Sequence, residues 1–288
     1  MRSNSLAKLK PGDKIDPSLT LLSNIDPKNS DPVLLVWNHP HWCPMVCKVF
    51  GSPRRANREA AALSAFSHPN IVRSFGFKKP SYTLMEYLDG PNLSALISTK
   101  PNGRMSISDS IRIAIHIGSA LQHIHSKGFI HMDVKPANVI VVHGKPVLFD
   151  FGSIRILGNR RPNRLDGTDA YMAPEELLRS KVDEKADIFS LGVTLFELLT
   201  GKLPFPEGKR LGQQAQIHLA PKRLNAYRKD APQSLEQLVA ACLAKDSQSR
   251  PSLPDLLPAL NDLLRSGPRM WPQHFHPNID VQKTRAAS

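Results

Sequence analysis

The pattern of hydrophobic and polar positions changes character near residue 90 of the chain. Before that point, short runs rich in Val, Trp, Phe and Tyr predict strands within 33–50, around a proline-containing turn, and again at 71–77 and 82–88. Between them, the alanine-rich segment 54–67 carries its apolar positions at helical spacing, and Pro69 follows it. The first ninety residues are therefore predicted to be mostly sheet with one helix.

Helical periodicity dominates after Gly90. Ser106 or Ser108 is expected to cap a long helix that Gly128 closes. Segment 129–152 predicts short strands and loops. Segment 187–201 predicts a helix that is apolar on all sides, and segments 234–246 and 254–266 predict amphipathic helices. The pattern predicts an α+β fold with a small β-rich N-lobe, a larger and mostly α-helical C-lobe, and a hinge near 86–92.

Composition places the chain among ordinary globular proteins. Its 288 residues are 41% hydrophobic and 22% charged, which excludes a disordered chain, a collagen and a coiled coil. Three cysteines cannot form a disulfide framework, no apolar run approaches the roughly 20 residues of a membrane span, and the N-terminal stretch has no apolar leader region. We therefore expect a cytoplasmic location.

The charge balance is strongly basic, with 38 Lys and Arg against 25 Asp and Glu, for a net charge of +13. A surplus of this kind serves solubility or attracts an acidic partner. The basic residues are dispersed and are not interleaved with aromatic residues, so nothing in the sequence indicates binding to nucleic acid or to a membrane. Neither the charge nor the pattern indicates an oligomeric state.

Chemistry-bearing residues gather in three motifs in the second half of the chain. His131-Met-Asp-Val-Lys-Pro-Ala-Asn138 is followed by Asp150-Phe-Gly152, and Ala173-Pro-Glu175 comes later. With these motifs the chain resembles the eukaryotic-type (Hanks-type) Ser/Thr protein kinases over roughly residues 20–265. The resemblance implies a bilobal kinase domain with its N-lobe at 20–88 and its C-lobe at 89–265. Residues 1–19 would then be an N-terminal extension and residues 266–288 a tail.

The family resemblance implies a reaction and a role for each motif residue. The reaction is transfer of the γ-phosphate of ATP to Ser or Thr hydroxyls of a protein substrate, with Mg²⁺ or possibly Mn²⁺ as the metal. Asp133 would accept the proton of the attacking hydroxyl, and Lys135 would sit against the transferred phosphate. Asn138 and Asp150 would offer oxygen ligands to the metal.

The N-lobe and the hinge would supply the nucleotide site. The sequence MVCK matches the family's strand lysine at Lys48, which would bridge the α- and β-phosphates and pair with Glu59 on the following helix. The hinge match makes Met85 the gatekeeper. The remaining nucleotide contacts would be apolar walls from Val33, Val46 and a residue near Ile140, backbone bonds to adenine from Glu86 and Leu88, and a ribose contact from Asn92.

Four further residues are expected to support the site without taking part in the chemistry. Thr168 matches the threonine that tethers the catalytic Asp and Lys in Ser/Thr kinases. Glu175 should pair with Arg250 inside the C-lobe, and Asp187 should brace the catalytic loop.

The glycine-rich loop of the family is missing. Counted back from Val33, its three glycine positions fall on Asp26, Lys28 and Asp31, and no glycine occurs between Gly12 and Gly51. Glycines let the backbone approach the phosphates closely, and carboxylates there would repel phosphate unless they point away. This departure puts the affinity for ATP in question, but not the transfer machinery.

Met132 replaces the arginine of the family's H-R-D motif, which receives the activation-loop phosphate. Between Asp150 and Glu175 the hydroxyl residues are Ser153, Thr168 and Tyr171, so segment 154–167 offers no phosphorylation site. We expect activity without activation-loop phosphorylation.

Two other functions were weighed against the kinase. A pseudokinase, acting as a nucleotide-binding or scaffold module, would explain the missing glycines and Met132. A small-molecule phosphotransferase shares the Asp, Asn and Asp set, but it lacks the segment from Gly167 to Glu175, which favours a protein substrate.

Overall fold

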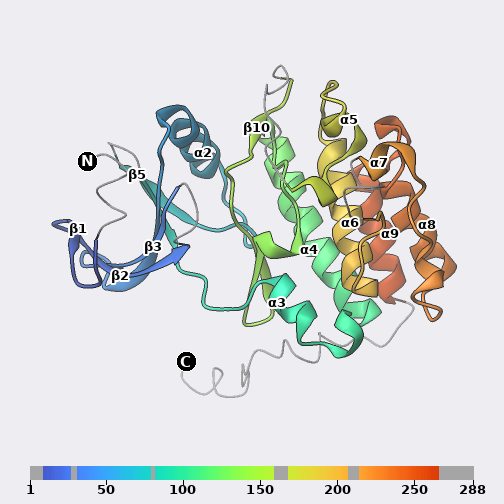
Figure 1. The fold of residues 1–288 in the computed structure, drawn as a ribbon, viewed down its shortest axis with the longest axis horizontal. Helices are drawn as coiled ribbons and strands as arrows, with labels where there is room; N and C mark the ends of the chain where they lie inside the picture. The colour runs from blue at the N-terminus through green and yellow to red at the C-terminus, as the bar shows by residue number, and fades with distance from the viewer. Residues whose placement is uncertain (1–8, 27–30, 79–81, 159–167, 207–213, 266–288) are drawn as a thin grey trace, which may run out of the picture.

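Two lobes of different construction meet at the segment after Glu86 (Figure 1). The computed structural model describes residues 9–26, 31–78, 82–158, 168–206 and 214–265. The sheet-rich lobe lies on the left of the view and the helical lobe on the right. This arrangement confirms the α+β, two-lobed fold predicted from the pattern.

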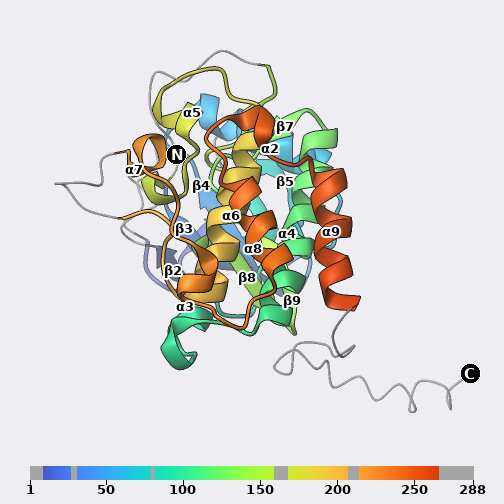
Figure 2. The same cartoon turned by 90° about the vertical axis from the view of Figure 1, so that its right-hand side faces the viewer.

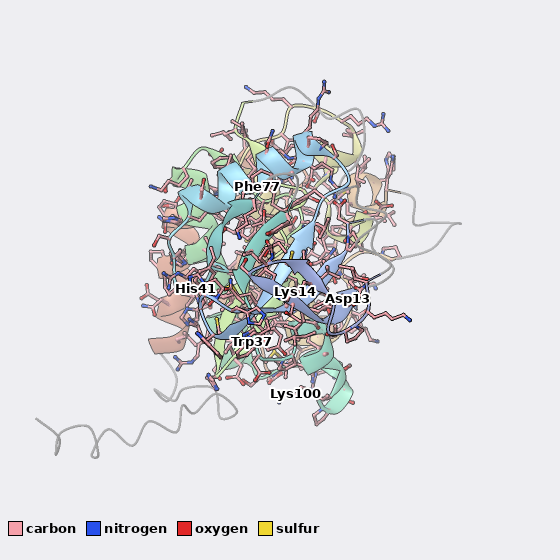
Figure 3. The ribbon with its side chains drawn as sticks, turned by 90° about the vertical axis from the view of Figure 1, so that its left-hand side faces the viewer. Asp13, Lys14, Trp37, His41, Phe77 and Lys100 are labelled. Carbon is pink, nitrogen blue, oxygen red and sulfur yellow. The ribbon has the colours of Figure 1, made fainter. Side chains whose placement is uncertain are left out.

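The N-lobe is one antiparallel sheet with a helix packed against it. The strands follow the order β1-β2-β3-β4-β6-β5. Their bounds are β1 (Lys14–Asp16), β2 (Leu19–Asp26), β3 (Val33–Asn38), β4 (Cys43–Val49), β5 (Ser74–Lys78) and β6 (Tyr82–Glu86), and the helix is α2 (Pro53–Ala65). Alternate residues of β3 and β4, such as Leu34 and Met45, fill the core of this lobe. Figure 3 looks onto its outer side, where Trp37, His41 and Phe77 are labelled.

The sheet begins earlier than the kinase domain predicted from residue 20. Strand β1 pairs with β2, and Ile15 and Leu19 are buried in the lobe's core. Residues 14–19 therefore belong to the folded lobe, although they fall in the predicted extension 1–19. A strand of three residues is too short for alternation to reveal it.

The C-lobe is built from helices, with two small sheets on the side that faces the N-lobe. Four of its helices, α4, α6, α8 and α9, run side by side (Figure 2). The helices are α3 (Leu93–Ser98), α4 (Ile107–Ser126), α5 (Pro174–Leu177), α6 (Lys185–Thr200), α7 (Ala215–His218), α8 (Gln233–Cys242) and α9 (Leu253–Arg265). The strands are β7 (Phe129–Ile130), β8 (Val139–Val142), β9 (Lys145–Leu148) and β10 (Arg155–Ile156).

Helix α6 is the centre of this lobe, as its continuous apolar sequence predicts. Nearly all its residues are buried. A Cβ atom on Gly192 would lie 2.7 Å from the Cβ of Cys242, so only glycine lets α8 pack this closely. Helix α4 begins where predicted, because the Ser106 side chain accepts a hydrogen bond from the Asp109 N–H. None of the helices in the described part of the chain is long and apolar enough to cross a membrane.

Two histidines fix the segment between α2 and β5, His68 from within the segment itself and His123 from helix α4. The Nδ1 atom of His68 accepts from the Asn70 N–H at 3.1 Å, and the Nε2 atom of His123 accepts from the Ser67 N–H at 3.2 Å. A ring nitrogen can accept a hydrogen bond only when it carries no proton. Burial and the neighbouring His123 and His116 lower the pKa of His68, and burial and Lys127 lower that of His123.

We expect acid to loosen this junction. Because both folded-state pKa values lie below the unfolded value of 6.5, the stabilisation is complete above that pH and is lost as the pH falls through the folded-state values. Each lost histidine contact should lower the melting temperature by about 3 °C. Thermal denaturation between pH 7.5 and pH 5 measures the effect.

The double variant His68→Asn/His123→Gln keeps an amide oxygen near each acceptor position but does not titrate. Its melting temperature should fall less steeply with acid than that of the wild type. His218→Asn, at an exposed position of α7, serves as the control. Equal slopes in the double variant and the wild type would show that these histidines do not cause the acid sensitivity.

Candidate active site

Lys48 lies where three elements of the two lobes meet. Its Nζ atom is 3.0 Å from both carboxylate oxygens of Glu59 on α2, and 2.8 Å from Oδ1 of Asp150, which follows β9. A buried ammonium group is costly unless it is paired. Burial by itself lowers the pKa of Lys48, but Asp150 and Glu59 outweigh it and raise that pKa, so the lysine stays charged. The predicted Lys48–Glu59 pair is present in the structure.

Asp150 is held as an anion in a strained backbone. Burial alone would raise the pKa of its carboxyl group, but the Lys48 ammonium lowers it to about 2. Its φ is 61°, in the left-handed region that non-glycine residues rarely occupy. Its side chain remains 39% exposed, so a charged carboxylate faces the opening between the lobes.

The predicted catalytic residues converge on the carboxylate of Asp133. Oδ2 lies 2.8 Å from both Lys135 Nζ and Asn138 Nδ2, and Oδ1 accepts from the Thr168 N–H at 3.1 Å. Thr168 also places its Oγ1 atom 2.5 Å from Lys135 Nζ. Three residues from two separate segments thus fix one carboxylate in place.

Asp187 on α6 holds the loop that carries Asp133, as predicted. Its carboxylate accepts from the backbone N–H groups of His131 and Met132, both at 2.9 Å, and lies 2.8 Å from Nε2 of His125. Burial would raise the pKa of Asp187, but the bond to His125 and its charge lower that pKa. Met132 has a φ of 70°, in the left-handed region that non-glycine residues rarely occupy.

The predicted Glu175–Arg250 pair is bidentate. Nη1 and Nη2 of Arg250 each donate to one carboxylate oxygen of Glu175 at 2.7 Å, and Arg250 also donates to the carbonyls of Ala244 and Lys185. The pair is buried and ties α5 to the segment before α9.

Strand register brings the predicted apolar walls together. Val33 is opposite Lys48, and Val46 is opposite Met85. Across the opening, the backbone of Asn92 pairs with that of Ile140 on β8. Met85 is buried, whereas Leu88 is half-buried in the segment that joins the lobes.

Two of the predicted nucleotide-binding residues have structural tasks of their own. The Asn92 Oδ1 atom accepts from the Ala95 N–H at 2.9 Å and caps α3. Glu86 accepts from the Arg73 N–H with its side chain and donates its own N–H to the Arg73 carbonyl. The ribose contact of Asn92 stays a prediction, and so do the adenine contacts of Glu86 and Leu88.

Sequence reasoning missed the contacts of two arginines on α2. Nη2 of Arg58 donates to the Gly152 carbonyl at 2.9 Å, and Nη2 of Arg55 lies 2.9 Å from Oδ2 of Asp31. The two arginines share α2 with Glu59, and Arg55 precedes it by one helical turn. That spacing was the only signal, and nothing in the sequence linked either arginine to residues so distant in the chain.

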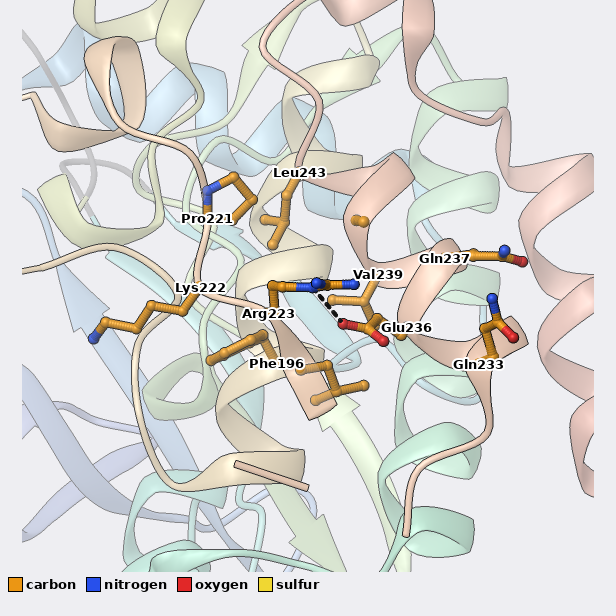
Figure 4. Close-up of a pocket in the computed structure, with 11 residues that line it drawn as sticks. Phe196, Pro221, Lys222, Arg223, Gln233, Glu236, Gln237, Val239 and Leu243 are labelled. Atoms are coloured by element: carbon orange, nitrogen blue, oxygen red, sulfur yellow. Dashed lines mark ion pairs between the residues drawn. The ribbon is translucent and has the colours of Figure 1, made fainter. Parts of the chain in front are cut away.

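A separate cavity of about 270 Å³ lies in the C-lobe between α6, α8 and segment 221–224 (Figure 4). Arg223 and Glu236 form an ion pair there, with 3.6 Å between Nε and Oε1. None of the predicted site residues lines this cavity.

Comparison with known proteins gives one family. Residues 47–259 match the model of the protein kinase domain. Serine/threonine-protein kinase PrkC of Bacillus subtilis is 34% identical over 202 residues, which cover 67% of this chain and 31% of that protein. Serine/threonine-protein kinase A of a Synechocystis strain is 31% identical over 259 residues, covering 81% of this chain and 48% of that protein.

The chain spans only about a third to a half of the length of these two relatives. Among solved structures, a mutant of the Mycobacterium tuberculosis PknI kinase domain matches with a TM-score of 0.70 and 24% identity. The match covers 90% of this chain and 99% of that one. At this identity the likeness supports the fold alone.

We expect Arg250→Met to lower the free energy of unfolding by about 3–5 kcal/mol, because it leaves the Glu175 carboxylate buried without its cation. Urea unfolding followed by circular dichroism measures the loss. Glu175→Met/Arg250→Met removes both charges and should recover part of the stability. A double variant less stable than Arg250→Met would contradict this account of the pair.

Proposed function

We propose that this chain, which belongs to the protein kinase family, transfers the γ-phosphate of ATP to serine or threonine hydroxyls of a protein. The observation that carries the proposal is the arrangement around Asp133. The Lys135 ammonium group, the Asn138 amide and the Thr168 backbone N–H all lie within hydrogen-bond distance of this one carboxylate. The family's use of ATP and protein substrates, and its serine/threonine kinase members, support the same conclusion.

The residues have distinct tasks in this reaction. Asp133 accepts the proton of the substrate hydroxyl while the oxygen of that hydroxyl forms a bond to the γ-phosphorus. The bond from that phosphorus to the bridging oxygen breaks, and ADP leaves with the electron pair. Lys135, held between Asp133 and Thr168, positions the transferred group, and Lys48 positions the α- and β-phosphates.

The donor set fits a divalent metal ion, for which we propose Mg²⁺. Asp150 presents a charged carboxylate, and Asn138 uses its Nδ2 atom on Asp133, which leaves its amide oxygen as the ligand atom. When bound, the ion would neutralise charge on the phosphate oxygens. Mn²⁺ has the same preference for oxygen ligands and is the alternative metal.

The proposal also covers the charge of the protein substrate, the cellular compartment and the bounds of the domain. The net charge of +13 favours an acidic protein substrate. The cysteine content favours the cytoplasm. We assign the kinase domain to residues 20–265, together with the strand at Lys14–Asp16, and leave 266–288 as a tail.

Asp133→Asn and Asp150→Ala should each lower phosphate transfer from labelled ATP by at least about a hundredfold, because one removes the proton acceptor and the other a metal ligand. Transfer to the protein itself and to acidic and basic test substrates is measured. Phosphoamino-acid analysis of the product distinguishes serine and threonine from tyrosine.

Asp255→Asn, at an exposed position of α9, is the charge-matched control and should keep full activity. Nucleotide binding by the folded wild type without any transfer would contradict the proposal and favour the pseudokinase alternative.

Activity should not depend on phosphorylation of the activation segment. Segment 154–167 contains no hydroxyl residue, and Met132 offers no cation for a phosphate. The Oγ1 atom of Thr168 already contacts Lys135, so a phosphate on that oxygen would disrupt this contact. Phosphatase treatment should leave activity unchanged, and mass spectrometry should find Thr168 unmodified. A Thr168 phosphate that raises activity would show that this prediction is wrong.

A further inference from the structure

Asp31 ties the end of the segment between β2 and β3 to the start of helix α2. Counted from Val33, it stands at the position of the third glycine of the family's phosphate-covering loop. Its side chain is only 3% exposed. Oδ1 accepts from the Gly51 N–H at 3.0 Å, and Oδ2 lies 2.9 Å from Nη2 of Arg55. A carboxylate buried this far requires such partners.

Arg55 reaches from Asp31 toward the turn that follows Asp150. Its Nη2 atom lies 3.9 Å from the point that a Cβ on Gly152 would occupy, and Nζ of Lys48 lies 3.4 Å from the same point. The Arg55 cation therefore stands near the site expected to hold the nucleotide phosphates. Its side chain is 44% exposed, so the guanidinium contacts solvent as well as Asp31.

Helix α2 makes three polar contacts around this site. Glu59 binds Lys48, Arg58 binds the Gly152 carbonyl, and Arg55 binds Asp31. The first two contacts place the helix against the residues that would hold ATP and metal. The third links the same helix to the strand that begins at Val33, which is opposite Lys48 in the sheet.

We propose that Arg55 and Asp31 are positioning residues for the nucleotide phosphates. The inference rests on the proposed function and deepens it. Arg55 neutralises the Asp31 carboxylate, which would otherwise repel the phosphates, and it fixes the end of the β2–β3 segment relative to the Lys48–Glu59 pair. In this chain an ion pair holds Asp31, which stands at the position of the family's third loop glycine.

Substitution of Arg55 alone and substitution of both residues of the pair should have different effects on ATP binding. Removal of Arg55 alone leaves a buried carboxylate near the phosphate site, which raises the cost of bringing in ATP. Removal of both charges relieves that repulsion. A purely structural pair would show this recovery in the free energy of unfolding, but the KM for ATP of the folded variants would stay unchanged.

The test compares ATP binding and transfer in a double-mutant cycle. Arg55→Met should raise the KM for ATP about tenfold, in the range of coupling between residues in contact. We expect kcat to change by less than about threefold, because the contacts of Asp133 are untouched. Asp31→Asn/Arg55→Met should restore the KM to within about threefold of the wild type. Asp31→Asn keeps an acceptor for the Gly51 N–H and completes the cycle.

Arg54→Met is the matched control, since it removes one positive charge at an exposed position of the same helical turn. Arg55→Lys keeps the charge and should lie between the wild type and Arg55→Met. If thermal denaturation shows that Arg55→Met is unfolded, Arg55→Gln, which also removes the charge, replaces it in the cycle. The dissociation constant of Mg²⁺–ATP, measured by calorimetry, should follow the same order as the KM.

The outcomes separate this inference from the proposed function. Wild-type binding of ATP without transfer would overturn the kinase proposal, while the calorimetric cycle would still test the ion pair. A KM for Arg55→Met equal to that of Arg54→Met would overturn the inference. So would a double variant that binds ATP no better than Arg55→Met, or a wild type that binds no ATP.

Discussion

The ammonium group of Lys48 must be paired with carboxylates, and this one requirement joins the two lobes. A charge removed from water is costly unless partners replace the lost hydration. Its partners come from α2 and from the turn after β9, so the pairing is complete only when sheet, helix and C-lobe are in place together. The arrangement of the residues that we propose to bind the nucleotide therefore depends on the pairing of this one buried charge.

Within the C-lobe, the carboxylate of Asp187 joins separate segments of the chain, as the ammonium group of Lys48 joins the two lobes. This carboxylate lies in the buried helix α6 and collects two backbone N–H groups and His125. Those contacts hold the backbone through Met132, whose φ of 70° is unfavourable for a side chain of its size. Strain next to Asp133 is thus balanced by bonds to the buried helix α6, and these bonds orient the Asp133 carboxylate that we propose as the proton acceptor.

The sequence predicted the parts of the site that depend on short spacing and on local pattern. The helices around α4 and α6 follow from local pattern, whereas the Lys48–Glu59 pair and the loop from Asp133 to Asn138 were implied by the resemblance of short motifs to the kinase family. It did not predict the contacts of Arg55 and Arg58, because their partners are brought near only by the packing of α2 on both lobes. The strand at Lys14–Asp16 was not predicted for a different reason: three residues are too few to show the alternation of hydrophobic and polar side chains.

The departures from the family pattern fall on parts that approach the phosphates or receive a regulatory phosphate. The glycine positions at 26–31 and the arginine position at Met132 are altered, whereas the contacts that orient Asp133 are complete. Asp31, the altered position that the structure places against α2, is not a carboxylate left facing phosphate, because it is paired with Arg55. A chain that had lost catalysis would have no need to keep Asp133, Lys135, Asn138 and Asp150 around one opening. Their joint geometry therefore favours changed nucleotide handling and regulation over lost phosphoryl transfer.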